Sequence, residues 1–251
     1  MIQLKDISKK FGSKIVLENI DLSIDLNSVY CLLGKNGVGK STILNILLDL
    51  VKPTKGSVLI FDRTYEESSI GIKKITGCMI ENVPIIENIS AKDYLIFISL
   101  LHELPMQVAK ERVNDLLKFF FENDEITNKK INTFSTGMKK KIAICASLLN
   151  NPKLLIWDEP FAGLDPVSSQ RVIDFIKFYI SIDRIILISS HDLVYVDQIA
   201  THIGILDKGQ LVYNGTYSDF TDGKNKQIEN EVRNYLHFDA TDTTALSWMA
   251  Q

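Results

Sequence analysis

The sequence has few cysteines and no long apolar run. Its three cysteines, Cys31, Cys78 and Cys145, lie in apolar stretches without a CxxC spacing, which argues against a disulfide or zinc framework and predicts three buried, reduced thiols in a cytosolic chain. The longest apolar runs, such as YLIFI at 94–98, are far shorter than the roughly 18 residues of a membrane-spanning helix. The N-terminus also lacks the apolar core of a secretory signal. We therefore expect a chain with no recognisable signal and no membrane span.

Neither sign of charge predominates in the sequence. The 28 basic and 31 acidic residues give a net charge of -3 without a long block of either sign, so nothing in the charge balance points to nucleic acid. The densest run, Lys139–Lys141, predicts a solvated helix face rather than a phosphate-binding patch. With 251 residues, 45% of them hydrophobic, the chain can form one large domain or a domain with a subdomain.

Hydrophobic patterning divides the chain into regions. Residues 2–30 alternate apolar and polar side chains, which predicts strands with one solvated face in an antiparallel or mixed arrangement. Three later apolar segments are each followed by a helical pattern, which predicts parallel strands with crossover helices. These segments are VYCLL at 29–33, LLIW at 154–157 and RIILIS at 184–189, with helices beginning at Lys40, at Pro166 and near Leu193.

Two further regions complete the chain. Residues 90–149 repeat apolar side chains at helical spacing, which predicts a separate helical lobe. A hairpin is expected around Lys208–Gly209, and a polar tail follows. The first half of that tail favours a helix, whereas the last dozen residues give no prediction.

The stretch LLGKNGVGKST, residues 32–42, matches the phosphate-loop pattern G-x-x-x-x-G-K-[ST] between a predicted strand and a predicted helix. Glycines allow successive N–H groups to point at phosphate oxygens, next to the partly positive N-terminus of the helix. Lys40 would reach the β and γ phosphates, the Ser41 hydroxyl would bind Mg²⁺, and Thr42 would add a phosphate contact. The candidate binding residues are Gly34, Asn36, Gly37, Gly39, Lys40, Ser41 and Thr42.

Polar side chains follow the other two apolar strands. Asp158 and Glu159 end LLIWDE, and His191 follows the apolar strand in RIILISSHD. Asp158 is the expected Mg²⁺ partner, because this hard cation takes few protein oxygens, and Glu159 is placed to orient and polarise a water molecule. A solvated acidic strand end is the alternative. Since parallel strands deliver their carboxyl ends to one crevice, we expect these side chains and the phosphate loop to converge.

Together with FSTGMKKKIAICASLLNNPKLLIWDEPFAGLDP at 134–166, these residues resemble the ATP-binding cassette (ABC) ATPase family over about residues 1–220. The resemblance implies an α/β fold: a P-loop NTPase core with a mainly parallel sheet, an N-terminal antiparallel β subdomain and an inserted helical subdomain. The implied divisions are an ATPase domain at 1–221, made of a core at 1–89 and 152–221 and a helical subdomain at 90–151, and a tail at 222–251.

The resemblance also implies roles for single residues, with ATP and Mg²⁺ as cofactors. Phe11 matches the aromatic residue that stacks on adenine, an interaction of about 1–3 kcal/mol in comparable base stacking. Glu159 matches the glutamate that positions water for attack on the γ-phosphate, and His191 matches the histidine that holds this phosphate. Lys40 would stabilise the transition-state charge. Asp165 matches the loop that communicates between two sites.

Residues Ser135–Met138 are similar to the signature loop of the family. In a head-to-tail dimer it completes the ATP site of the other subunit, and Ser135 and the Gly137 backbone would contact the γ-phosphate there. This chain carries Thr136 where glycine is usual and Met138 where glutamine is usual, and Glu81 replaces the glutamine that touches Mg²⁺ and water. These departures resemble the branch that includes bacitracin and lantibiotic self-protection exporters.

We therefore expect the ATP-binding and ATP-hydrolysing subunit of a transporter, exporting an antimicrobial peptide or a drug. The chain would act as a homodimer or beside a related ATPase. It would bind separate transmembrane permease subunits at the cytoplasmic face of the membrane, and no nucleic acid. The alternatives are a soluble assembly ATPase of the iron–sulfur type and a nucleotide-binding regulator without hydrolysis. DNA-maintenance relatives carry long coiled coils between the phosphate loop and the signature, where this chain has only a short helical segment.

Overall fold

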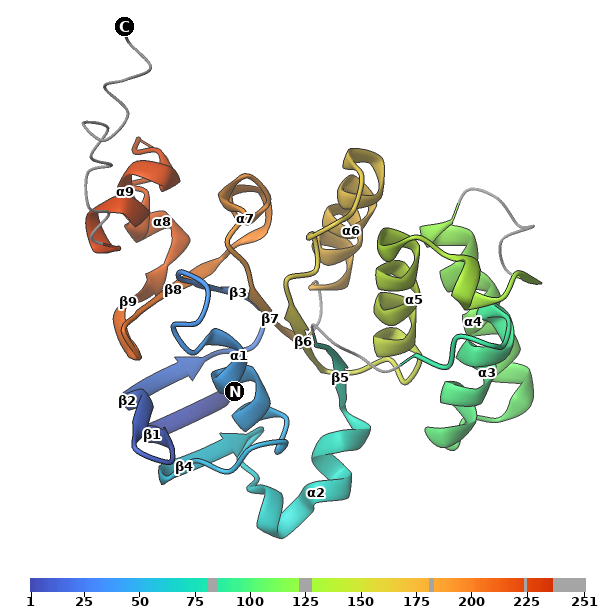
Figure 1. Ribbon diagram of the computed structural model, residues 1–251, viewed down its shortest axis with the longest axis horizontal. Helices are drawn as coiled ribbons and strands as arrows, with labels where there is room; N and C mark the ends of the chain where they lie inside the picture. The colour runs from blue at the N-terminus through green and yellow to red at the C-terminus, as the bar shows by residue number, and fades with distance from the viewer. Residues whose placement is uncertain (81–84, 122–127, 181–182, 224, 237–251) are drawn as a thin grey trace, which may run out of the picture.

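The computed structural model consists of two sheets, the helices that cover them and a helical lobe at one side (Figure 1). It describes residues 1–80, 85–121, 128–180, 183–223 and 225–236. Within these ranges, no helix has the length and apolar character that crossing a bilayer requires.

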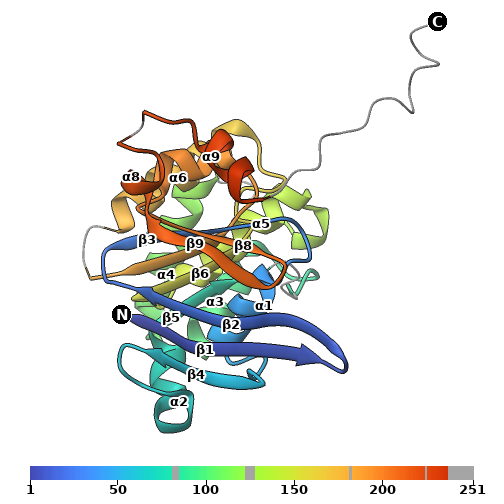
Figure 2. The ribbon, with the colours of Figure 1, turned by 90° about the vertical axis from the view of Figure 1, so that its left-hand side faces the viewer.

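The N-terminal segment forms a small antiparallel sheet in the order β2-β1-β4. Its strands are β1 (Ile2–Phe11), β2 (Lys14–Ile24) and β4 (Lys55–Ile60). Apolar side chains on one face, among them Ile2, Ile7 and Leu17, are fully buried, as the alternating pattern predicts. Figure 2 shows this sheet beside the larger one, where the Glu18 N–H of β2 donates to the Gly209 carbonyl at 2.9 Å.

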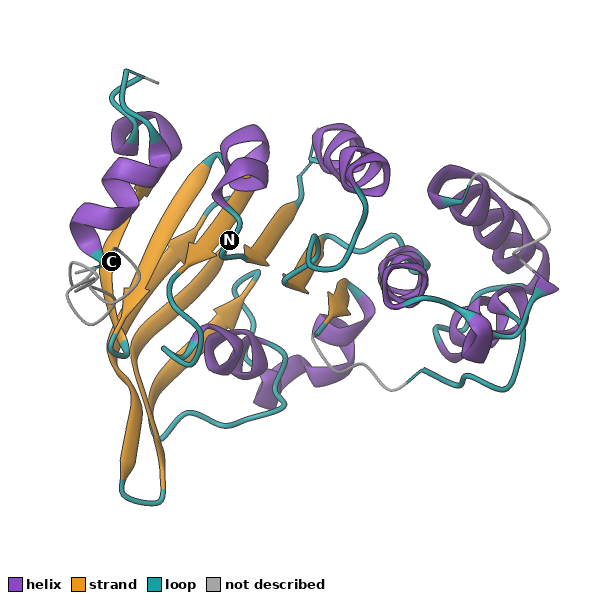
Figure 3. Ribbon diagram, turned by 45° about the horizontal axis from the view of Figure 1, so that its top comes forward, coloured by secondary structure: helices purple, strands orange, loops and turns teal. Residues whose placement is uncertain are grey.

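In the described part of the chain, the larger sheet has six strands in the order β5-β6-β7-β3-β8-β9. All neighbours are parallel except β9, which pairs antiparallel with β8 in the expected hairpin. Strands β3, β6 and β7 are buried along their whole length, because helices cover both faces of the sheet (Figure 3). The strands are β3 (Ser28–Leu33), β5 (Thr76–Met79), β6 (Leu154–Asp158), β7 (Ile185–Ser189), β8 (His202–Asp207) and β9 (Gln210–Thr216).

A separate apolar core lies on each face of this sheet. Alternate residues of β3 point to opposite sides: Tyr30 and Leu32 pack with α1 and the antiparallel sheet, whereas Cys31 and Leu33 pack with α6, α7, α9 and the lobe. The covering helices are α1 (Lys40–Leu47), α2 (Tyr65–Lys74), α6 (Pro166–Tyr179), α7 (Leu193–Ile199), α8 (Tyr217–Phe220) and α9 (Ile228–Tyr235).

The helical lobe is inserted between the neighbouring strands β5 and β6 and contains α3 (Ala91–Leu101), α4 (Met106–Phe120), the 3₁₀ turn η2 (Ile131–Thr133) and α5 (Thr136–Leu148). Helix α5 joins the lobe to the sheet, since the Trp157 Nε1–H of β6 donates to the Ser147 Oγ at 3.0 Å. The predicted fold class is therefore confirmed, including the inserted lobe.

Two expectations from the sequence are wrong. Cys31 and Cys145 are buried and free, but Cys78 is exposed, because it lies on β5, which is the edge strand of the sheet among the described residues. The lysine run at 139–141 is half-buried rather than a solvated face. Lys139 pairs with Glu87 at 2.7 Å, and the Lys141 ammonium lies 4.5 Å from the centroid of an aromatic ring, that of Phe121.

The first half of the tail forms a helix, as expected. Ile228 and Val232 of α9 and the following Leu236 are buried in the same core as β8. The last dozen residues lie outside the described part of the chain.

Candidate functional site

Three loops meet at one edge of the larger sheet. Strands β6, β7 and β3 are consecutive and parallel, so the segments that follow them, which begin at Glu159, Ser190 and Gly34, emerge side by side. These are the three predicted strand ends, and the fold brings them together.

The loop after β3 depends on glycine at two close approaches. A Cβ on Gly34 would lie 2.4 Å from the Leu206 carbonyl oxygen, and a Cβ on Gly39 would lie 2.7 Å from Leu17 Cδ2. Both residues also have positive φ, 152° and 114°, which side chains disfavour. The backbone between them, including the exposed Asn36 and Gly37, therefore curves around the start of α1.

Helix α1 begins at the end of this loop, with no acidic residue in its first turn. Its free N–H groups and partial positive charge favour an anion. Ser41 is exposed there and Thr42 is half-buried. Lys40 is only 6% exposed, and its Nζ donates to the carbonyls of Gly34 at 2.7 Å and Lys35 at 3.3 Å. The ammonium group thus lies inside the curve of the loop.

Glu159 connects the three loops. Its Oε1 lies 2.9 Å from His191 Nδ1 and 4.0 Å from Lys40 Nζ. Its backbone is left-handed, with φ of 50°, a conformation that costs roughly 1–2 kcal/mol for a residue with a side chain. The carboxylate is therefore held between a cation and an imidazole, where it can orient a polar group bound at the loop.

Asp158 is buried at the end of β6, and the Ser189 hydroxyl of β7 donates to its Oδ1. The same hydroxyl accepts from the Glu159 N–H at 3.3 Å. Ser189 is not among the residues that the motifs predict. Its signal in the sequence is a hydroxyl at the end of an apolar strand, where a buried polar group needs a partner.

Two of the predicted ligands offer oxygens of the kind that a hard cation takes. Ser41 offers a hydroxyl and Asp158 a carboxylate, and a cation such as Mg²⁺ binds a few such oxygens and keeps several waters. The third predicted ligand, Glu81, lies outside the described residues.

Phe11 and Asp165 lie at the tip of a hairpin and at the start of a helix. Phe11 ends β1 at the tip of the β1–β2 hairpin, half exposed, with the Lys9 ammonium 4.7 Å from its ring centroid. Asp165 caps α6, because its Oδ1 accepts from the Ser168 N–H at 2.9 Å and its Oδ2 from the Ser168 hydroxyl at 2.7 Å. These hydrogen bonds hold the pKa of Asp165 below its ordinary value.

Ser135 and Gly137 belong to the start of α5, in the lobe. The Ser135 hydroxyl caps this helix by accepting from the Met138 N–H at 3.2 Å, and the residue is exposed. Gly137 lies against the loop after β6, since a Cβ there would stand 2.7 Å from the Gly163 carbonyl oxygen.

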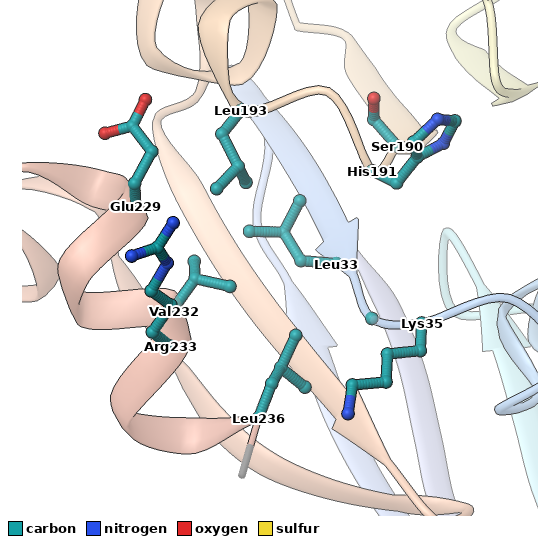
Figure 4. Close-up of a pocket in the computed structure, with 10 residues that line it drawn as sticks. Leu33, Lys35, Ser190, His191, Leu193, Glu229, Val232, Arg233 and Leu236 are labelled. Atoms are coloured by element: carbon teal, nitrogen blue, oxygen red, sulfur yellow. The ribbon is translucent and has the colours of Figure 1, made fainter. Parts of the chain in front are cut away.

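A cavity of about 280 Å³ lies beside His191, between the end of β3, α7 and α9 (Figure 4). Leu33, Leu193, Val232 and Leu236 form its apolar wall, and Lys35 and Arg233 lie at its margin. Helix α9 thus closes one side of the region next to the histidine.

Comparisons with known proteins identify the family of the chain. The family model described as ABC transporter matches residues 17–162. The lantibiotic transport ATP-binding protein SrtF of Streptococcus pyogenes is 35% identical, covering 92% of this chain and 97% of the relative. The bacitracin transport ATP-binding protein BcrA of Enterococcus faecalis is 31% identical, covering 96% of this chain and 75% of the relative.

Among solved structures, a dimeric ATP-binding cassette in a post-hydrolysis state with ADP and Pi matches with a TM-score of 0.77 and 25% identity, covering 86% of this chain and 98% of that one. An ATP-binding subunit of an ABC transporter shares the fold, with a TM-score of 0.86 at 24% identity over 94% of this chain and 99% of that one. The chain therefore belongs to the ABC transporter family, as an ATP-binding and ATP-hydrolysing subunit.

Proposed function

We propose that this subunit powers the export of an antimicrobial peptide or drug, and that Lys40, Glu159 and His191 carry out the hydrolysis. The observation that carries the proposal is the position of Glu159 Oε1, 2.9 Å from His191 Nδ1 and 4.0 Å from Lys40 Nζ. In the proposal, the carboxylate, the cation and the imidazole surround the end of a phosphate chain that is bound at the loop.

In this proposal the loop from Gly34 to Gly39 and the start of α1 bind the phosphates through backbone N–H groups. The Lys40 ammonium would turn from the loop carbonyls to the β and γ phosphates and stabilise the charge that develops there. The Glu159 carboxylate would orient the attacking water, and His191 would hold the γ-phosphate. Asn36, Gly37 and Thr42 complete the phosphate contacts, and Phe11 stacks on the adenine.

Ser41 and Asp158 would hold Mg²⁺, with Glu81 near it. The cation, when bound, neutralises phosphate charge. The Ser189 hydroxyl donates to one Asp158 oxygen, and this hydrogen bond orients the carboxylate.

The proposal includes a dimer, either of two copies or with a related ATPase. Ser135 is exposed at the start of α5, in the lobe rather than beside Lys40, so its proposed contact with a γ-phosphate requires a second subunit. Gly137 would add its backbone, and Asp165 would lie between the two sites. The dimeric cassette in the similar structure supports this arrangement. The proposed divisions are a core at 1–89 and 152–221, a lobe at 90–151 and a tail from 222.

Separate transmembrane permease subunits would convert closure of the dimer into transport at the cytoplasmic face of the membrane. The names of the relatives, which transport a lantibiotic or bacitracin, support transport rather than iron–sulfur assembly. They also support an antimicrobial peptide as the cargo.

The role of Glu159 is tested by Glu159→Gln, which keeps the size of the side chain and removes its charge. We expect ATP binding to persist, turnover to fall at least about 100-fold, and closed dimers to accumulate in size-exclusion chromatography with ATP. Glu87→Gln is the matched control, because Glu87 is an exposed partner of Lys139. Hydrolysis by Glu159→Gln at the wild-type rate would refute the role.

The partner and the cargo need a second experiment in native cells. Purification of the chain from detergent-treated membranes should recover a polytopic membrane protein, whereas recovery of a soluble complex would favour assembly. A strain without the chain should become sensitive to a lantibiotic or bacitracin, and unchanged sensitivity to both would contradict the proposed cargo.

A further inference from the structure

Lys140 links the helical lobe to the candidate catalytic loop. It lies in the first turns of α5, and its Nζ donates to the backbone carbonyl of Glu159 at 2.7 Å. The lysine is half-buried, so this charged hydrogen bond is partly shielded from water. A side chain of the lobe therefore contacts the main chain of the residue that carries the site carboxylate.

A second contact joins the same two segments. Gly137, one turn before Lys140, approaches the Gly163 carbonyl so closely that no Cβ fits between them. The start of α5 thus contacts the loop 159–165 at two points, Glu159 and Gly163. Movement of α5 would be transmitted to Glu159 through these contacts.

Both backbone groups of Glu159 are held. Its N–H donates to the Ser189 carbonyl at 3.1 Å, and its carbonyl accepts from the Ala162 N–H at 3.3 Å as well as from Lys140. These contacts stabilise the left-handed conformation, with φ of 50°, that points the carboxylate at His191. A residue in such a conformation persists when its surroundings determine it.

We propose that Lys140 is a positioning residue for hydrolysis: it holds the Glu159 backbone so that its carboxylate keeps its place, and it couples that place to the signature end of α5. This inference rests on the role proposed for Glu159. Lys140 contacts no bound nucleotide in this scheme. Its removal should therefore impair turnover rather than nucleotide binding.

The test compares Lys140→Met with Lys139→Met in the full-length chain. Both substitutions remove one ammonium group from the same helix, but Lys139 pairs with Glu87. We expect kcat for ATP to fall at least about tenfold in Lys140→Met, because small displacements of a catalytic group cost up to about 100-fold. KM should stay within about twofold, and Lys139→Met should match the wild type.

Rescue separates positioning from a general effect on folding. Lys140→Arg keeps a cationic donor of similar reach, and it should recover most of the wild-type kcat at an unchanged melting temperature. Should Lys140→Met aggregate, Lys140→Gln and Lys140→Arg provide the same comparison. A Lys140→Met or Lys140→Gln variant with the kcat of Lys139→Met, or with a raised KM and unchanged kcat, overturns the inference. The proposed function is tested separately, by ATP hydrolysis in the wild type and by its loss in Glu159→Gln.

Discussion

Replacing Ser189 by alanine should destabilise the chain more than the same change at the neighbouring Ser190. The Ser189 hydroxyl donates to the buried Asp158 carboxylate and accepts from the Glu159 N–H. That N–H keeps a second acceptor, the Ser189 carbonyl, so the main loss is the hydrogen bond to the carboxylate. Ser190 is equally buried, but the hydrogen bond described for its Oγ is a neutral one, which it accepts from the Asp192 N–H.

The two losses differ in magnitude. A hydrogen bond to a charged group contributes about 1.5–3 kcal/mol and a neutral one about 1 kcal/mol. For a chain of this size, each kcal/mol shifts the melting temperature by about 2–4 °C. We therefore expect Ser189→Ala to lower the melting temperature by roughly 3–12 °C and Ser190→Ala by only about 2–4 °C.

Differential scanning calorimetry without nucleotide measures this difference, since a bound nucleotide would raise the melting temperature by mass action. Melting of Ser189→Ala at or above the temperature of Ser190→Ala would refute the reasoning. In that case the carboxylate of Asp158 does not depend on the serine.

Two further predictions concern titration and reactivity. Asp165→Asn retains an acceptor for the cap but loses the carboxylate whose folded pKa the Ser168 hydrogen bonds depress. The folded chain binds this proton more weakly than the unfolded chain does. The difference in unfolding free energy between the wild type and Asp165→Asn should therefore shrink as the pH falls below about 4. Urea titrations at several pH values measure this difference. An equal difference at every pH would contradict this. A maleimide reagent should label Cys78 in the native chain but not Cys31 or Cys145, because Cys78 is exposed whereas the other two are fully buried. Burial raises the pKa of all three thiols, so access to the sulfur makes the difference; mass spectrometry showing two or more labels would contradict the described burial.

The sequence predicts the parts of the fold whose signals are local. Strands β3, β6 and β7 appear as uninterrupted apolar runs because helices bury both of their faces. The phosphate loop has a fixed glycine spacing because Gly34 and Gly39 each leave no room for a Cβ. The meeting of Lys40, Glu159 and His191 also follows from the parallel order of the strands.

Other features depend on contacts between distant residues, so the pattern alone does not predict them. The pattern does not predict strand β4, because this strand is defined by its antiparallel pairing with β1. The pattern does not predict helix α2 either, since the helix is kinked at Ser68, whose backbone is non-helical. The roles of Ser189 and Lys140 depend on which backbone groups lie beside them in the folded chain.

The insertion of the lobe between two neighbouring strands has a kinetic consequence. Thr76 of β5 pairs with Leu154 of β6, so the pairing encloses the whole lobe in one loop. Closing a long loop costs entropy before any contact compensates for it. The lobe helices, whose contacts are local, should form early during refolding, and β5 should join the edge of the sheet late.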